Sequence, residues 1–208
     1  MTVGIKVSYK SKDDGFRSMK KRLENINGSA IEVGVLKGEH AWLASIHEYG
    51  MEIRPGRAQY LTVPLTPDAV GRRANSFPNT FVYTAKSGNK FIAQKSGNGL
   101  KLLYWLTKSV RIPERSFLRT GFDENKADVM KKAQMMLADV ADGKMSEEEF
   151  YKAIGLELSS KIKGYASDLD NPANSSITSN NKGSSNPLFD TGDMIGSITW
   201  RKEGGAAQ

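Results

Sequence analysis

The stretch ASIHEYG, residues 44–50, holds the pair of side chains best suited to chemistry, His47 and Glu48. A histidine beside an acid is the raw material of a zinc site or of general acid–base catalysis. A helical zinc-protease motif needs a second histidine four residues on, and position 51 is Met. His40 stands two helical turns earlier, about 10 Å away, too far to bind the same ion. We therefore favour a structural role for His47.

Four aspartates form the next candidate site: Asp168, Asp170, Asp190 and Asp193. Metal-dependent nucleases use such carboxylate clusters. Asp190 fits equally well as a helix cap, and the first two precede a polar loop. The glycine turns KSGNK and KSGNG lack the ending of a phosphate-binding loop and fit hairpin turns. We expect no enzyme activity, no metal and no cofactor, with a nuclease as a weaker alternative.

Length, composition and net charge limit the classes of protein to which the chain can belong. A chain of 208 residues can bury a core of its own. It has no cysteine, which excludes disulfides and thiolate zinc sites and fits a reducing cytoplasm. The net charge of +7 and the pI of about 9.5 suit a nucleic-acid or acidic-protein partner. MTVGIKVSYK does not look like a signal peptide, and no run approaches the roughly 20 apolar residues of a membrane helix, so we expect no membrane partner.

The elements that must position these residues follow from hydrophobic periodicity. Apolar residues alternate in the strands and recur every three or four positions in the helices, and Ser146 with Glu149 makes a capping box. This pattern predicts an α/β (α+β) protein: a small mixed β-sheet packed by two or three helices. The expected strands are 3–9, 30–36, 59–64 and 196–202, and the expected helices are 13–26, 117–141 and 147–169. A short helix over 40–49 should bury Trp42, Leu43 and Ile46.

Residues 67–111 differ in composition and are expected to be an insertion rich in β-hairpins. The core domain is then residues 1–66 and 112–203. The segment 171–187, NPANSSITSNNKGSSNP, is polar and predicted to be a flexible loop, and 204–208 a disordered tail.

The insertion carries much of the positive charge, with Asp68 as its single acid. Two interpretations stay open. The lysines and arginines form a solvated hairpin face, or some of them contact DNA phosphates. The residues proposed for a DNA channel or phosphate contact are Arg72, Arg73, Lys86, Lys90 and Lys95.

Three blocks in order carry a resemblance to a known family. They are VGVLKGEHAWLASIHEYG, then RIPERSFLRTGFDEN, then PLFDTGDMIGSITW after a Ser/Asn-rich loop. Together the chain resembles the neck and tail-completion proteins of tailed bacteriophages, a group that includes lambda-type tail-completion and Mu-type virion morphogenesis proteins. The long basic insertion departs from that pattern.

The resemblance implies a structural virion protein at the head–tail junction, made in the host cytoplasm and located in the neck or tail. Such proteins form rings, commonly sixfold, around the DNA channel. The implied partners are copies of the same chain, head connector or stopper proteins, the tail terminator or tail tube protein, and genomic DNA.

The family pattern matches fourteen positions. They are His47, Glu48, Tyr49, Gly50, Ile112, Pro113, Arg115, Phe117, Leu118, Leu188, Asp190, Thr191, Gly192 and Ser197. From these we expect the subunit or partner interface to include His47, Glu48, Tyr49, Arg115, Phe117, Asp190 and Thr191, with Glu48 as a hypothetical carboxylate partner of Arg115.

Overall fold

The computed structural model of the protein describes residues 14–26, 29–182 and 186–203. The strand expected at 3–9 and the tail at 204–208 lie outside these ranges. The chain forms two compact units. Unit 1 joins the described residues up to Ala44 with Ser116–Asp168 and the residues from Thr191 on; unit 2 joins Ser45–Arg115 with Leu169–Asp190. The segment expected as an insertion at 67–111 therefore belongs to a larger unit than its composition suggested.

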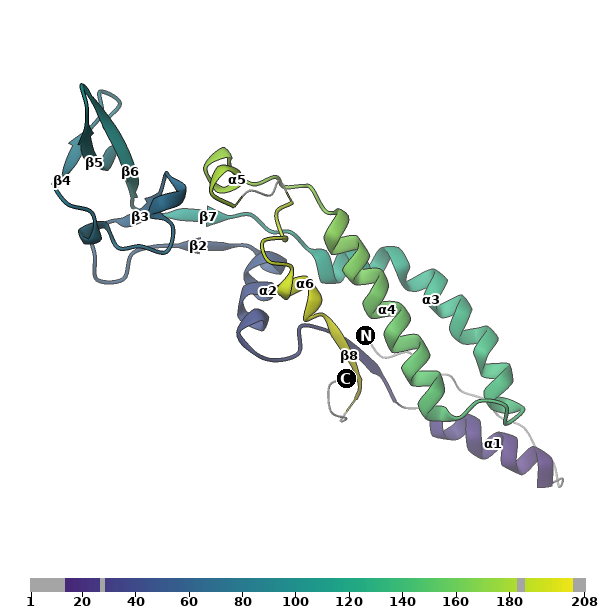
Figure 1. Ribbon diagram of the computed structural model, residues 1–208. Coiled ribbons are helices and arrows are strands. Elements are labelled where there is room, and N and C mark those ends of the chain that lie inside the picture. Colours follow the sequence, from purple (N-terminus) through teal and green to yellow (C-terminus); the bar gives the residue numbers. More distant parts are fainter. Residues whose placement is uncertain (1–13, 27–28, 183–185, 204–208) are drawn as a thin grey trace. The chain divides into compact units, whose positions relative to one another are not determined.

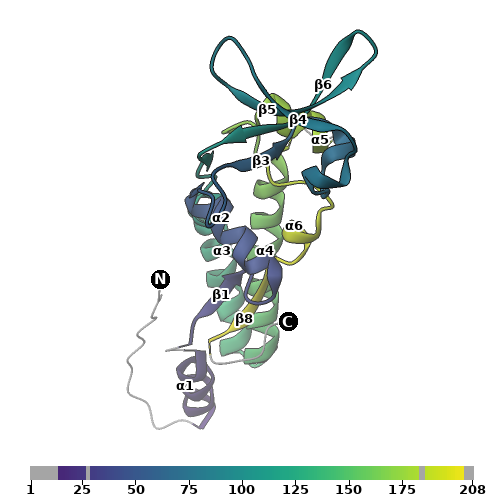
Figure 2. The same cartoon turned by 90° about the vertical axis from the view of Figure 1, so that its left-hand side faces the viewer.

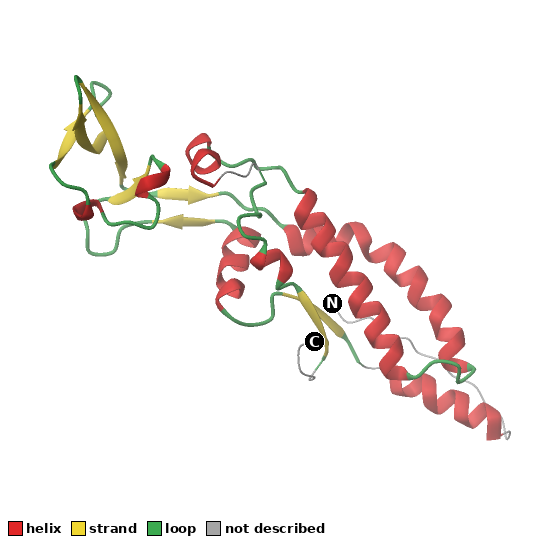
Figure 3. Cartoon of the chain, in the orientation of Figure 1, coloured by secondary structure: helices red, strands yellow, loops and turns green. Residues whose placement is uncertain are grey.

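Unit 1 is mainly helical, and unit 2 is mainly strands (Figure 3). The α+β fold class predicted from the sequence is confirmed. The expected single mixed sheet is not formed. Its strands divide between a two-stranded sheet in unit 1 and a four-stranded sheet in unit 2, and all described pairings are antiparallel.

Unit 1 is built on a helical hairpin of α3 (Phe117–Ala141) and α4 (Glu147–Asp168) (Figure 1). Both helices have the bounds that periodicity predicts to within a residue. The capping box is confirmed, because the Glu149 N–H donates to Ser146 Oγ at 3.2 Å and the Ser146 N–H donates to the Glu149 carboxylate at 2.8 Å. The buried stripe of α4 includes Phe150, Ile154 and Leu158.

Helix α1 (Asp14–Ile26) joins this hairpin through a cap on α3. The Arg22 guanidinium donates to the carbonyls of Val140 at 3.1 Å and Ala141 at 2.6 Å. These carbonyls belong to the last turn of α3, where helical acceptors lack partners and the helix dipole favours a cation. Arg22 therefore satisfies acceptors at the end of α3 and fixes α1 to it.

Strands β1 (Ile31–Gly34) and β8 (Thr199–Lys202) pair antiparallel, with Ile31 opposite Lys202. Trp200 of β8 is buried against α4 at Gly155, where an added Cβ would lie 2.1 Å from the indole. Only glycine allows this approach of strand to helix. The one-turn helix α6 (Asp193–Gly196) leads into β8.

Helix α2 (Glu39–Tyr49) carries the boundary between the units after Ala44. Ile46 is buried as predicted, but the prediction for Trp42 and Leu43 is wrong, because 63% and 37% of these residues is exposed. The apolar residues of this short helix lie on more than one side of it, so only part of them can face a core.

The main sheet of unit 2 has the order β3-β6-β5-β4. Figure 2 views this sheet together with its hairpin turns. Its strands are β3 (Leu61–Pro64), β4 (Thr80–Thr84), β5 (Lys90–Ser96) and β6 (Gly99–Thr107). The predicted hairpins are confirmed. A short ladder of β2 (Met51–Ile53) and β7 (Val110–Ile112) completes the strands of this unit.

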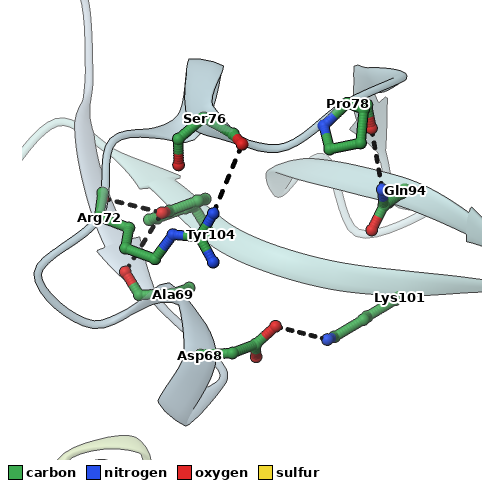
Figure 4. Close-up of polar contacts among 8 residues, drawn as sticks. All are labelled: Asp68, Ala69, Arg72, Ser76, Pro78, Gln94, Lys101 and Tyr104. Atoms are coloured by element: carbon green, nitrogen blue, oxygen red, sulfur yellow. Dashed lines mark hydrogen bonds and ion pairs between the residues drawn. The ribbon is translucent and has the colours of Figure 1, made fainter.

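A small core lies against the sheet, where the chain forms two 3-10 turns, Pro67–Ala69 and Ala74–Ser76. Strand β6 has a register shift at Leu103, because Ile92 lies opposite Tyr104 and Ala93 lies opposite Leu102. This bulge allows the consecutive residues Leu103 and Tyr104 both to lie in the core. Tyr104 Oη donates to the carbonyl of Arg72 at 2.8 Å, with that of Ala69 at 3.2 Å (Figure 4). Phe77 meets the Tyr104 ring edge-on at 6.0 Å.

Residues 171–187 contain regular structure where a polar loop was predicted. Helix α5 (Ser176–Lys182) forms there, and the Asn181 amide donates to the carbonyl of Pro64 at 2.9 Å. Helix α5 has no buried residue, and polar contacts with the rest of unit 2, such as the one from Asn181, hold it in place.

Candidate functional site

The residues of the first two blocks meet in unit 2. Helix α2 ends at Tyr49, and Gly50 follows with φ of +71°, the left-handed conformation that favours glycine. A Cβ at Gly50 would lie 2.8 Å from the Glu114 nitrogen and 3.0 Å from the Ile112 carbonyl. The segment after β7 therefore passes so close to the helix end that a glycine is required.

Arg115 is the centre of this meeting point. Its N–H donates to the carbonyl of His47 at 2.7 Å, and its side chain is buried, with 4% of the residue exposed. The guanidinium donates to the carbonyl of Pro172 at 2.7 Å and to that of Ala173 at 3.3 Å. It also lies 3.4 Å from Asn174 Oδ1 and 3.5 Å from His47 Nδ1. We call this set of contacts the arginine clamp.

Burial and two neighbouring cations lower the pKa of His47. Burial, and then the positive charges of Arg115 and Lys182, lower the pKa of His47 to about 4. The ring is therefore neutral near pH 7, and the tautomer with the lone pair on Nδ1 lets that atom accept from the guanidinium. A neutral acceptor on a buried cation fits a structural role for His47, which stays a prediction.

Lys182 lies close enough to His47 to act on its pKa, and it was not among the residues predicted for the site. Its ammonium donates to the carbonyls of Asn186 at 3.4 Å and Pro187 at 3.2 Å. Burial lowers the pKa of Lys182, and Asp190 acts in the opposite direction. The acceptors of Arg115 and Lys182 are largely main-chain carbonyls, which every residue has. The sequence therefore indicates the two basic residues but not the partners that they bind.

The remaining residues expected at the interface differ in how far they are exposed. Glu48 is buried, with 2% exposed, and Tyr49 is 65% exposed. Phe117, the first residue of α3, is completely buried. The Thr191 hydroxyl donates to the Asp193 carboxylate at 2.6 Å, and Asp190 is exposed.

The expected phosphate-contact residues are not equivalent either. The Arg72 guanidinium lies over the Phe77 ring at 4.2 Å, and Lys90 donates to Tyr60 Oη at 3.2 Å. Lys101, also basic, pairs with Asp68 at 2.7 Å (Figure 4). These side chains already have partners within the unit.

Arg73, Lys86 and Lys95 are exposed, and no acidic side chain among the described residues pairs with them. Lys86 follows β4 and Lys95 lies near the far end of β5, about 20 Å away at the rise of a strand. Lys86 and Lys95 are thus far apart along the β4–β5 hairpin, as contacts to a polyanion would need, while Arg73 precedes the 3-10 turn Ala74–Ser76.

Unit 1 holds an apolar cavity of about 210 Å³ between α1, β1, α3 and α4. Ile26, Ile31, Met130 and Phe150 are among its lining residues. Its lining is mainly apolar, with Ser29, Lys126 and Tyr151 as the polar side chains among the described residues.

In the part of the chain that the structure describes, no group of three or more histidine, aspartate or glutamate side chains is placed to hold a metal ion. None of the helices in the described ranges is both long and apolar enough to cross a membrane. No family model, curated protein or solved structure matches the chain.

Proposed function

We propose that the protein is a structural component of the neck of a tailed bacteriophage, where it joins tail to head. In this proposal copies of the chain form a ring, sixfold as in the family it resembles, around the DNA channel. Head connector or stopper proteins lie on one side and the tail terminator or tail tube protein on the other. The protein is not an enzyme.

The observation that carries the proposal is the meeting of the HEYG and IPER blocks. Gly50 admits the backbone of Ile112–Glu114, and Arg115 ties His47 to residues 172–174. Sequence signatures whose residues hold a fold together, with a histidine kept neutral by burial and by two cations, support a structural protein better than a catalyst.

The test is electron microscopy of lysates from a phage with a stop codon in this gene. Full heads and finished tails lying apart are the expected result, and the wild-type gene supplied in trans should restore joined particles. Normally joined particles without the protein would rule out the joining role.

A second candidate is a DNA-binding accessory protein, and the three unpaired cations favour it. The triple variant Arg73→Glu, Lys86→Glu, Lys95→Glu should weaken binding to duplex DNA and lower the slope of log K against log salt by about 3, roughly one per lost contact. Lys90→Glu is the matched control, since Lys90 is held by Tyr60. An unchanged slope for the triple variant would exclude this candidate.

A further inference from the structure

The two edges of the four-stranded sheet in unit 2 differ. At the β3 edge, Leu65 donates inward to Leu103, so Pro64 faces outward by alternation along the strand. Pro64 has no N–H to offer, and its carbonyl accepts from Asn181. This edge is closed to a further strand by the two devices that proteins commonly use, a proline and a covering segment.

The β4 edge has neither device. Its sequence, TFVYT, has no charge and no proline, and Val82 and Phe81 are 61% and 38% exposed. Among the described residues, β5 is its only strand neighbour. An uncharged, apolar edge of this kind is a template for a further strand.

The direction of the free hydrogen-bonding groups follows from the ladder with β5. Ala85 donates to Asn89 across the hairpin, so Tyr83 and Phe81 also bond inward. Thr80, Val82 and Thr84 therefore present their N–H and C=O groups to the open side.

We propose that β4 pairs antiparallel with β4 of a second copy of this chain. The strand is self-complementary about Val82. Thr80 lies opposite Thr84 of the second copy, Val82 opposite Val82, and Thr84 opposite Thr80, so each outward N–H finds an acceptor. Phe81 and Tyr83 face each other at the closer, non-hydrogen-bonded positions, where aromatic pairs stabilise a ladder.

The ends of the strand fit this register. Asn79, with φ of +55°, stops β4 on one side, and the turn after Ala85 stops it on the other. No charged residue of β4 meets a like charge across the pair. The contact is two-fold and closed, so it is separate from any ring contact and does not depend on the proposed phage function.

Sedimentation velocity tests the proposal. Wild-type protein should sediment with twice the mass of 22.9 kDa as its concentration rises. Val82→Lys and Val82→Glu should each raise the dimer Kd at least about tenfold, because like charges then lie directly opposite. An equimolar mixture of the two variants should dimerise again, because position 82 lies opposite position 82 and the mixed pair then brings opposite charges together.

Val82→Cys gives a covalent readout in a chain with no other cysteine. Residues opposite in a hydrogen-bonded pair have Cα atoms about 5.5 Å apart, within disulfide range. The variant should form a disulfide-linked dimer on mild oxidation, and Thr62→Cys on the closed β3 edge should not. Circular dichroism melts confirm folding of each variant.

A monomeric wild type at high concentration, or a dimer that Val82→Lys leaves intact, overturns the proposal. Monomeric charge variants that fail to dimerise when mixed overturn the self-pairing and point to a strand from a different protein.

Discussion

Unit 1 and unit 2 solve the problem of stability in different ways. Unit 1 buries apolar stripes of long helices, and Trp200 fills the space left by Gly155. Unit 2 has a small core and holds its segments together with a buried arginine bound to main-chain carbonyls. The first kind of contact depends on shape, and the second depends on charge and hydrogen-bond geometry.

The largest effect should come from a loss of shape in unit 1. Gly155→Ala places a methyl 2.1 Å from the indole of Trp200, which is 3% exposed and cannot move aside. We expect the free energy of unfolding to fall by about 3 kcal/mol or more, measured by urea denaturation.

Gly164→Ala is the matched control, because an added Cβ there meets nothing within 4 Å on the same helix. It should raise stability by about 0.5–1 kcal/mol. Equal effects at the two glycines would show that strand and helix do not pack as described.

Breaking the clamp should affect unit 2 and leave unit 1 in place. Arg115→Met leaves the carbonyls of Pro172 and Ala173 without their donor, at about 2–3 kcal/mol. Hydrogen exchange should accelerate over residues 169–182 and stay unchanged in α3 and α4. Exposed Arg57→Met is the control, expected within about 0.5 kcal/mol. Uniform loss of protection across both units would refute the separation.

The same clamp predicts a pH dependence. The pKa of His47 is about 4 in the folded protein against an ordinary 6.5, so the unfolded chain binds the proton first. The contribution of neutral His47 to the free energy of unfolding is fully present above pH 6.5. It is lost between pH 6.5 and 4, and amounts to about 2 kcal/mol after allowance for partial exposure.

His47→Gln should remove this slope, and His40→Gln should keep it. Thermal melts from pH 4 to 7 measure both. A slope that survives in His47→Gln would mean that other groups carry it.

The smallest effect should come from the core of unit 2. Tyr104→Phe removes the hydroxyl that donates to the carbonyl of Arg72, at about 1 kcal/mol. Tyr83→Phe is the control, since its hydroxyl has no hydrogen-bond partner among the described residues. A Tyr104→Phe protein as stable as wild type would place the stability of this core in its rings alone.

The contrast between the units also explains what could be predicted from sequence. Helices α3 and α4 could be predicted from local patterns, namely the repeat of apolar residues and the Ser146–Glu149 capping box. The hairpins of β4, β5 and β6 were equally local. Residue type alone misled at Trp42, because an apolar side chain on a short helix has several directions to face.

The long-range pairings could not be predicted in the same way. Strand β1 pairs with β8, and Arg115 finds its acceptors at 172–174, so both contacts join distant parts of the chain. Helix α5 formed in a polar segment because Asn181 reaches Pro64. Main-chain carbonyls are common to all residues, so no pattern in the sequence marks the ones that are used.

The order of the segments has a consequence for synthesis of the protein. The chain passes between the units at residues 44/45, 115/116, 168/169 and 190/191. Neither unit can be expressed as one continuous fragment, and no single cut separates them. On the ribosome, Ser45–Arg115 of unit 2 emerges long before Pro172 and Ala173 reach Arg115, and β1 is made long before β8. Unit 2 is therefore completed only after residues 169–190 have been made, and unit 1 only after residues 191–203, and a nascent chain holds both in an unfinished state until then.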